Sequence, residues 1–337
     1  MAEPLIVADG LEVRFVGHRP FADTLRRRPP PFIRAVDGVS FTVAPGEVLA
    51  LVGESGCGKT TTGNLLLGLI PLSGGAVRYD GQPLADMGRR EMAALRRAAQ
   101  MIFQDPYESL NPRMRIGDII AEPLRVHGVA ADADDRRAKV RHALTQAGLA
   151  PAEVYENRFP FELSGGQRQR VVIAAALTLE PRLLVADEPV SMLDVSIRAD
   201  ILNLLRRLAT DERIAIVMIT HDLATVAAYA DRLAVMYLGR IVEIGDTKTV
   251  LADPQHPYTR ALLSVVPTTD PAARQRPQVL SGETPDPSRI PSGCRFHPRC
   301  PVAIEACKTV DPALVAIGAD HEAACILVGS GPIAQRG

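Results

Sequence analysis

The segment Gly53 to Thr60 constrains the fold more than any other part of the chain. It reads Gly-Glu-Ser-Gly-Cys-Gly-Lys-Thr, follows an apolar run at Val48 to Val52 and precedes a helical stretch. Glycines at a strand-to-helix junction let backbone N–H groups and the helix N-terminus surround a phosphate. A chance glycine-rich turn is the alternative. The residues expected to contact a nucleotide here are Gly53, Glu54, Ser55, Gly56, Cys57, Gly58, Lys59, Thr60 and Thr61.

Two side chains of this loop and two carboxylates further along the chain suit phosphate chemistry. We expect Lys59 to reach the β- and γ-phosphates and the Thr60 hydroxyl to bind Mg²⁺. Leu183 to Glu188 is an apolar strand that ends on two acidic residues. We expect Asp187 to hold Mg²⁺ through water and Glu188 to act as the general base on the attacking water. For this pair alone, a solvated strand end is the alternative.

A third motif, Leu163 to Arg170, begins with small residues at the start of a long apolar helix. An exposed helix N-terminus attracts anions because its first N–H groups are unpaired and the helix dipole is positive there. An ordinary serine-capped helix is an alternative that the residues alone leave open.

The order of elements predicts an α/β fold. Apolar runs at Leu183 to Ala186 and Ile214 to Ile219 flank the amphipathic stretch Ser196 to Ala209, which is the spacing of a mainly parallel βαβ unit. Three further expectations are an opening antiparallel β region at Leu5 to Phe15 and Val39 to Val43, an inserted loop at Phe21 to Phe32, and a helical insertion at Ile116 to Arg158.

Composition limits what else the chain can do. With 337 residues and 47% hydrophobic content, it can bury one core of about 200 to 250 residues and a smaller appendage. Its 38 basic and 39 acidic residues leave a net charge of −1, so no general field attracts nucleic acid. The chain shows no secretory signal and no run of the roughly 20 apolar residues that span a bilayer. We therefore expect a cytoplasmic protein that serves any membrane from its surface.

Taken together, the motifs resemble the ABC ATPase family over roughly residues 5–250. The phosphate loop, Leu163 to Gln167, and the acidic strand followed by Ser191 to Asp194 occur in the family's order, and Gln104 and His221 match its Q-loop glutamine and switch histidine. The resemblance implies a P-loop NTPase fold with an antiparallel β subdomain, a helical insertion at about residues 105–165 and a small C-terminal extension. It divides the chain into an ATPase domain at residues 1–252 and an extension at residues 253–337.

The resemblance also implies roles for individual residues. Hydrolysis would depend on Lys59, Glu188 and His221, with His221 holding the γ-phosphate. Gln104 would contact Mg²⁺ beside the two ligands already named.

ATP would lie between two subunits arranged head to tail. Phe15 would stack on adenine, and Phe32 is a weaker candidate for that position. Met192 departs from the family, which usually has a smaller residue in this contact loop between subunits. The residues that would contact the partner's ATP are Ser164, Gly165, Gly166, Gln167 and Asp194.

A longer resemblance narrows the family. Gln104 to Pro123 is similar to the ATPases of peptide importers, especially the second ATPase of dipeptide and oligopeptide systems, and His256 to Leu263 resembles their C-terminal extension. This implies peptide import energised from the cytoplasmic face of the membrane. The implied partners are a second ATPase subunit, two membrane permease subunits and an extracytoplasmic solute-binding protein; the implied cofactors are ATP and Mg²⁺.

Two alternatives to peptide import stay open at this stage. Nickel, opine and glutathione importers share the same motifs. A soluble ABC ATPase that acts on nucleic acid or ribosomes is a remoter alternative, because only Asp105 to Glu162 separates the Q-loop from the Leu-Ser-Gly-Gly-Gln segment, whereas that class carries long inserts.

Four of the five cysteines cluster near the C-terminus, where a reducing compartment favours metal or cluster ligation over disulfides. Their spacings of five, six and seventeen residues are looser than the Cys-x-x-Cys pairs of structural zinc. Some members of the resembling family carry an iron-sulfur cluster, so we expect [4Fe-4S] on Cys294, Cys300, Cys307 and Cys325. Zinc with His297 or His321 as a ligand, and four free thiols, are the alternatives.

Overall fold

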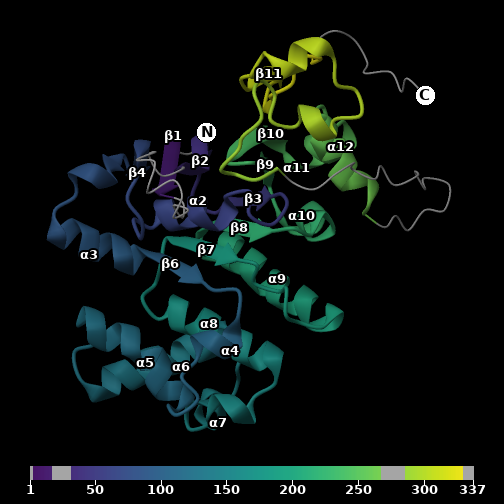
Figure 1. Ribbon diagram of the computed structural model, residues 1–337. Coiled ribbons are helices and arrows are strands. Elements are labelled where there is room, and N and C mark those ends of the chain that lie inside the picture. Colours follow the sequence, from purple (N-terminus) through teal and green to yellow (C-terminus); the bar gives the residue numbers. More distant parts are fainter. Residues whose placement is uncertain (1–2, 17–31, 267–284, 329–337) are drawn as a thin grey trace, which may run out of the picture. The chain divides into compact units, whose positions relative to one another are not determined.

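The computed structural model describes residues 3–16, 32–266 and 285–328. The chain forms two compact units, each built from separate segments (Figure 1). The first unit comprises residues 1–6, 42–48 and 78–219, and the second comprises residues 7–41, 49–77 and 220–337. Most of the inserted loop expected at Phe21 to Phe32 lies outside the described residues.

The first unit contains three neighbouring parallel strands. Strand β7 (Leu183–Asp187) pairs in parallel with β6 (Ala99–Ile102) on one side and with β8 (Ala215–Thr220) on the other. Every residue of β7 and β8 is buried, as continuous apolar strands predict. Helix α9 (Val195–Asp211) joins β7 to β8, which confirms the expected βαβ unit.

The structure adds an element that the sequence did not predict in this sheet. Helix α3 (Arg89–Ala98) ends where β6 begins. The residues after α3 form a strand because they pair with β7, which lies far along the chain.

The helical insertion lies in the first unit and contains no strand between β6 and β7 (Figure 1). Helix α5 packs against α6, α7 and α8, and buries Ile116, Ile120 and Leu124, which recur every four residues. The Asp132 carboxylate caps α6 by accepting N–H groups of its first turn. The helices are α4 (Pro106–Ser109), α5 (Ile116–His127), α6 (Ala133–Gln146), α7 (Ala152–Glu156) and α8 (Gly165–Leu177), with the short 3₁₀ helix η2 (Pro160–Glu162) before α8.

The second unit contains the strand that leads into the phosphate loop. Strand β3 (Val48–Val52), buried throughout, pairs in parallel with β9 (Arg232–Tyr237), and β9 pairs in antiparallel fashion with β10 (Arg240–Asp246). The helices of this unit are α2 (Lys59–Leu66), α10 (Leu223–Tyr229), α11 (Thr247–Ala252) and α12 (Pro257–Ser264).

The opening β region is longer than its alternating pattern predicted. Strand β1 (Ile6–Val16) lies between β2 (Phe32–Val43) and β4 (Gly74–Tyr79). Along the end of β2, buried residues alternate with exposed ones, so one face packs on the core. Strand β4 continues into a short antiparallel pairing with β5 (Gln82–Pro83), followed by the 3₁₀ helix η1 (Leu84–Asp86).

The C-terminal extension joins the sheet of the second unit. Strand β12 (His321–Ala323) pairs in antiparallel fashion with β10, and β11 (Val315–Gly318) pairs with β12. The rings of Tyr237, Tyr258 and Phe296 are buried and pack with centroids 4.7 to 5.3 Å apart. Local sequence patterns did not indicate this packing, because Phe296 and its two tyrosine partners lie in separate segments of the chain.

No helix among the described residues is long and apolar enough to cross a membrane.

Candidate nucleotide site

The phosphate loop connects β3 to α2 in the second unit, and its glycines are required by close contacts. A Cβ on Gly53 would lie 2.2 Å from the backbone oxygen of Met236, and a Cβ on Gly58 would lie 2.2 Å from that of Ala35. Both glycines also have positive φ, at 152° and 107°. The loop is therefore pressed against neighbouring backbone on two sides and holds one curled shape.

Lys59 folds back over the loop that precedes it. Its Nζ donates to the backbone oxygens of Gly53 and Glu54 at 2.8 and 2.9 Å, and the side chain is buried. The Sγ of Cys57 lies 3.8 Å from the same nitrogen, and burial raises the pKa of this thiol, which favours its neutral form. The cation is thus positioned over the concave face of the loop.

The start of α2 can receive an anion. No side chain caps this helix, whose N-cap residue is Gly58, so the N–H groups of its first turn face the loop without a protein side-chain acceptor. Ser55, Gly56 and Thr60 are exposed here, and Thr61 is half-buried. Thr60, whose hydroxyl the sequence assigned to Mg²⁺, is thus among the exposed residues at the start of the helix.

Glu54 is the exception within the loop, because its polar groups face the C-terminal extension. Its backbone N–H donates to the Tyr258 hydroxyl at 2.9 Å, and its carboxylate accepts a hydrogen bond from Arg299 at 2.8 Å. The sequence gave no indication of these two partners, which lie 204 and 245 residues away. The available signal was Tyr258 itself, because a buried Tyr hydroxyl needs a polar partner.

The other sequence-predicted residues of the second unit lie at element ends. Phe15 is near the end of β1 and Phe32 is the first residue of β2; both rings are about half exposed. His221 is exposed between β8 and α10, directly before the Asp222 that caps α10.

In the first unit, the acidic pair stands where β7 ends. Asp187 is the buried last residue of the strand, and Glu188 follows with a positive φ of 45°, an uncommon conformation for a residue with a side chain. The N–H of Glu188 donates to the backbone oxygen of Ile219 at 2.9 Å, which anchors this turn to β8.

Gln104 and Glu188 meet, although 84 residues separate them. The Nε2 of Gln104 donates to the Glu188 carboxylate at 3.2 Å. The structure therefore brings together the residue expected to contact Mg²⁺ and the expected general base.

The Leu-Ser-Gly-Gly-Gln segment begins α8 with a capping box. The Ser164 hydroxyl accepts the N–H of Gln167 at 3.3 Å, and the Gln167 side chain accepts the N–H of Ser164 at 3.0 Å. Gly166 is required, because a Cβ there would lie 2.4 Å from the Ile197 side chain. Ser164 is exposed, Gly165 and Gln167 are half-buried, and Asp194 is exposed as the N-cap residue of α9.

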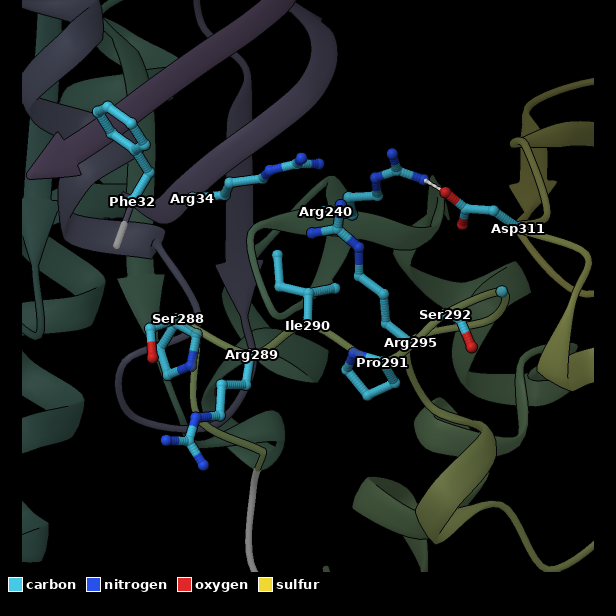
Figure 2. A pocket seen from close by; sticks show the side chains of 12 residues that line it. Phe32, Arg34, Arg240, Ser288, Arg289, Ile290, Pro291, Ser292, Arg295 and Asp311 are labelled. Carbon is cyan, nitrogen blue, oxygen red and sulfur yellow. Dashed lines mark hydrogen bonds and ion pairs between the residues drawn. The ribbon is translucent and has the colours of Figure 1, made fainter. Parts of the chain in front are cut away.

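A cavity of about 490 Å³ lies in the second unit and is rich in arginine (Figure 2). Arg295 and Arg240 both donate to Asp37, and Arg240 also donates to Asp311 at 2.5 Å. Burial alone would raise the pKa of Asp37, but Arg295 and its neighbours hold that pKa below the usual value. These contacts tie the extension to β2 and β10 through buried charge.

The four clustered cysteines influence each other's ionisation. Burial raises the pKa values of Cys294 and Cys325, and raises that of Cys300 to about 11; neighbouring cysteines add to each increase. The N–H of Cys294 donates to the backbone oxygen of Cys307 at 2.9 Å. All four are free thiols here.

Neither histidine proposed as a zinc ligand completes a metal site. The Nε2 of His321 lies 2.8 Å from the Glu243 carboxylate, and the Nδ1 of His297 lies 2.9 Å from the backbone oxygen of Cys294. In the part of the chain that the structure describes, no group of three or more His, Cys, Asp or Glu side chains is arranged to hold a metal ion. Neither the zinc alternative nor the expected [4Fe-4S] cluster therefore has support from the arrangement of these side chains.

Comparisons with known proteins identify the class of protein to which the chain belongs. Residues 36–191 match the family model described as ABC transporter. The fold is similar to the ATP-binding cassette MJ0796, whose dimer was solved with ADP and phosphate, at a TM-score of 0.62 and 26% identity over 72% of this chain and 98% of that one. It is equally similar to CbiO1 of Clostridium perfringens, at a TM-score of 0.62 and 28% identity over 74% and 91% of the two chains. The fold class expected from the motifs is confirmed.

Closer relatives and a second family model then specify the family. Residues 242–307 match the model described as oligopeptide/dipeptide transporter, C-terminal region. A peptide import ATP-binding protein of Brucella ovis is 51% identical over 87% of this chain and 92% of its own length, and the oligopeptide transport ATP-binding protein OppF of Escherichia coli is 46% identical over 89% and 90%. The chain belongs to the family of ABC transporter ATP-binding proteins of peptide importers.

Proposed function

We propose that the chain binds MgATP on the loop from Gly53 to Thr61 and hydrolyses it to energise peptide import. The observation that carries this proposal is the uncapped start of α2 beneath the buried ammonium of Lys59, which together form a cradle for the β- and γ-phosphates. A neutral loop of the same shape would bind ATP more weakly, because the positive charge of Lys59 attracts the negatively charged β- and γ-phosphates.

The donor set fits magnesium. Mg²⁺ prefers oxygen ligands, and Thr60, Gln104 and Asp187 supply a hydroxyl, an amide oxygen and a carboxylate. The ion would neutralise phosphate charge when it is bound. Gln104 would then present its amide oxygen to the ion while its NH₂ group stays directed to Glu188.

Glu188 takes the role of general base. Its carboxylate, which accepts a hydrogen bond from Gln104, would receive the proton of an attacking water. Its positive φ fixes the direction in which the side chain leaves the backbone. His221 would orient the same water and hold the γ-phosphate, and Phe15 would stack on adenine.

Residues of the first unit would serve the ATP of a second ATPase subunit. Ser164, Gly165, Gly166, Gln167 and Asp194 lie at the N-termini of α8 and α9, where helix dipoles favour anions. Ser164 and Asp194 are exposed and would be accessible to a partner's nucleotide. Met192, which is exposed near these residues, would contact that partner.

Peptides are the proposed solute, and two permease subunits, a solute-binding protein and a second ATPase are the proposed partners. Names of relatives from several bacteria support peptides, and no observation favours nickel, opines or glutathione. We place the chain at the cytoplasmic face of the membrane, bound through the permeases.

A transport assay tests this proposal. The chain is co-expressed with the permeases and ATPase encoded beside it, reconstituted in liposomes with the binding protein, and supplied with labelled peptides. We expect ATP-dependent uptake that Lys59→Ala abolishes. Uptake of nickel, an opine or glutathione in place of every peptide would assign a different solute, and uptake that persists in Lys59→Ala would contradict the proposed ATP site.

We further propose that Cys294, Cys300, Cys307 and Cys325 hold a [4Fe-4S] cluster. Support comes from the clustering of these four cysteines near the C-terminus, where a backbone hydrogen bond joins Cys294 to Cys307. Anaerobic purification followed by iron, sulfide and zinc assays should give four irons and four sulfides per chain. A folded protein without iron would refute this assignment and leave the ATPase proposal intact.

A further inference from the structure

The phosphate loop carries an acidic side chain whose charge opposes its proposed function. Glu54 lies directly after Gly53, within the loop that would hold the negatively charged phosphates of ATP. Two like charges near a site of low dielectric repel each other strongly. An unpaired carboxylate at this position would therefore weaken nucleotide binding.

Arg299 pairs with this carboxylate. Its Nη1 lies 2.8 Å from Glu54 Oε2, and only 8% of the Arg299 side chain is exposed, against 24% of the Glu54 side chain. Water screens the pair little, so the guanidinium offsets much of the carboxylate charge. The hydrogen bond also turns the carboxylate toward the extension.

Tyr258 fixes the backbone at the same residue. Its hydroxyl accepts the N–H of Glu54 at 2.9 Å, and burial raises the pKa of the phenol, so it stays neutral. Because this N–H is occupied, Glu54 does not offer it to a phosphate. The contact instead determines how the loop leaves β3, and hence where the N–H groups after it point.

Both contacts come from a rigid part of the extension. Arg299 ends the 3₁₀ helix η4 (His297–Arg299), and Tyr258 lies in the first turn of α12. The buried ring of Phe296 packs against both Tyr237 and Tyr258, with centroids 5.3 Å apart in each pair. Motion of either side chain would disturb this packing.

We infer that Arg299 and Tyr258 are positioning residues for nucleotide binding, through which the C-terminal extension sets the charge and shape of the phosphate loop. The inference rests on the proposed ATP site. It does not require a cluster on the cysteines, since both contacts are made by protein side chains.

A double-mutant cycle on the full chain tests the charge effect. Affinity for the Mg²⁺ complex of a non-hydrolysable ATP analogue is measured in the wild type, Arg299→Met, Glu54→Gln and the double variant. We expect Arg299→Met to weaken binding roughly tenfold, and to have almost no effect in the Glu54→Gln background, because the charge it balances is then gone. A merely structural role would give the same loss in both backgrounds.

Further variants separate positioning from folding. Arg299→Lys keeps the charge and should retain most of the affinity, and Tyr258→Phe should weaken binding about threefold by removing one hydrogen-bond acceptor. Lys308→Met removes an exposed cation that pairs with Glu305 in the same extension, and serves as the matched control with unchanged affinity.

Unchanged affinity in both Arg299→Met and Tyr258→Phe, or equal losses for Arg299→Met in both backgrounds, would overturn the inference. If the wild type itself fails to bind the analogue, the proposed function fails instead. The two failures are therefore distinguishable.

Discussion

The helical insertion contains an acidic side chain held by two arginines, and the C-terminal extension supplies an arginine to an acidic side chain of β2, but these arginines differ in burial. In the helical region, Glu156 accepts hydrogen bonds from Arg137 and Arg141, whose side chains are 59% and 34% exposed. In the extension, Arg295 reaches Asp37 with only 6% of its side chain exposed. The same chemistry thus gives a cluster that water and salt can weaken and one that belongs to the core.

This difference reflects how each region is attached. The helical region packs its own helices around the Glu156 cluster, whereas the extension adds β12 to the sheet of the second unit and Phe296 to its core. A domain that contributes to another's core cannot move without disrupting it. We therefore expect mutations in the extension to lower the free energy of unfolding far more than equivalent mutations in the helical region.

The largest effect should follow loss of the Phe296 ring. Phe296→Ala leaves a cavity between Tyr237 and Tyr258, and should lower the free energy of unfolding of the second unit by about 3 to 5 kcal/mol. Phe161→Ala in the helical region is the matched control, because this ring is 66% exposed, and should cost less than about 1 kcal/mol. Urea denaturation compares the two. Equal losses would contradict the proposed difference in attachment.

Removing one arginine from each cluster should give the next largest difference. Arg295→Met leaves Asp37 buried with weaker partners, so the unfolding free energy should fall by about 3 kcal/mol. Arg137→Met should have a much smaller effect, because Arg141 still holds Glu156 and water solvates the exposed Arg137 side chain. Denaturant titrations at low and high salt should show salt dependence only for the helical cluster.

As the pH falls, the extension should lose stability at a higher pH than the helical insertion does. Burial lowers the pKa of His256 to about 3, below an unfolded value near 6.5. The stabilisation from neutral His256 is therefore complete above pH 6.5 and is lost progressively as pH falls toward 3, by about 2 kcal/mol at pH 5. Protonation also removes the Nδ1 acceptor of the Tyr258 N–H. The Glu243 carboxylate faces the same segment through the His256 N–H.

Hydrogen exchange of α12, corrected for intrinsic pH effects, measures this loss. His256→Asn keeps an acceptor at the N-cap but does not titrate, so it should flatten the pH dependence. Protection of α12 that is constant from pH 7 to pH 5 in the wild type would show that His256 does not have a lowered pKa.

The helical insertion should lose stability only at lower pH, and the loss should be smaller. Hydrogen bonds from Arg141 and Arg137 lower the pKa of Glu156 to about 2, from an ordinary value near 4.5. Its contribution is present above pH 4.5 and is lost as pH falls toward 2; solvent screening limits it to about 1 kcal/mol. Glu156→Gln should reproduce this loss at neutral pH, measured by exchange of α6. A loss that begins above pH 5 would indicate another titrating group.

Local sequence patterns predicted those parts of the molecule whose partners are close in the chain. The apolar runs at Val48 to Val52 and Leu183 to Ala186 became β3 and β7, and the glycine loop lies between a strand and a helix as expected. Its glycines are explained by contacts with Met236 and Ala35 that only the fold reveals.

Strand β10 was not predicted, although it pairs with β9, which directly precedes it in the chain. Strand β10 contains Glu243, which is completely buried because it accepts N–H groups from Gln255 and His256 and contacts His321. From the sequence alone, a carboxylate within a strand is expected to face solvent. The same limit applies to Glu54, whose partners Tyr258 and Arg299 lie more than two hundred residues away.

Hydrolysis by Glu188→Gln at saturating MgATP tests the central claim most directly. The amide can position water but cannot accept its proton, so phosphate release should fall by about 10² to 10⁴ while MgATP affinity stays unchanged. Glu212→Gln, which alters an exposed carboxylate after α9, should hydrolyse at the wild-type rate. Wild-type phosphate release by Glu188→Gln would show that this carboxylate is not the general base and would contradict the account.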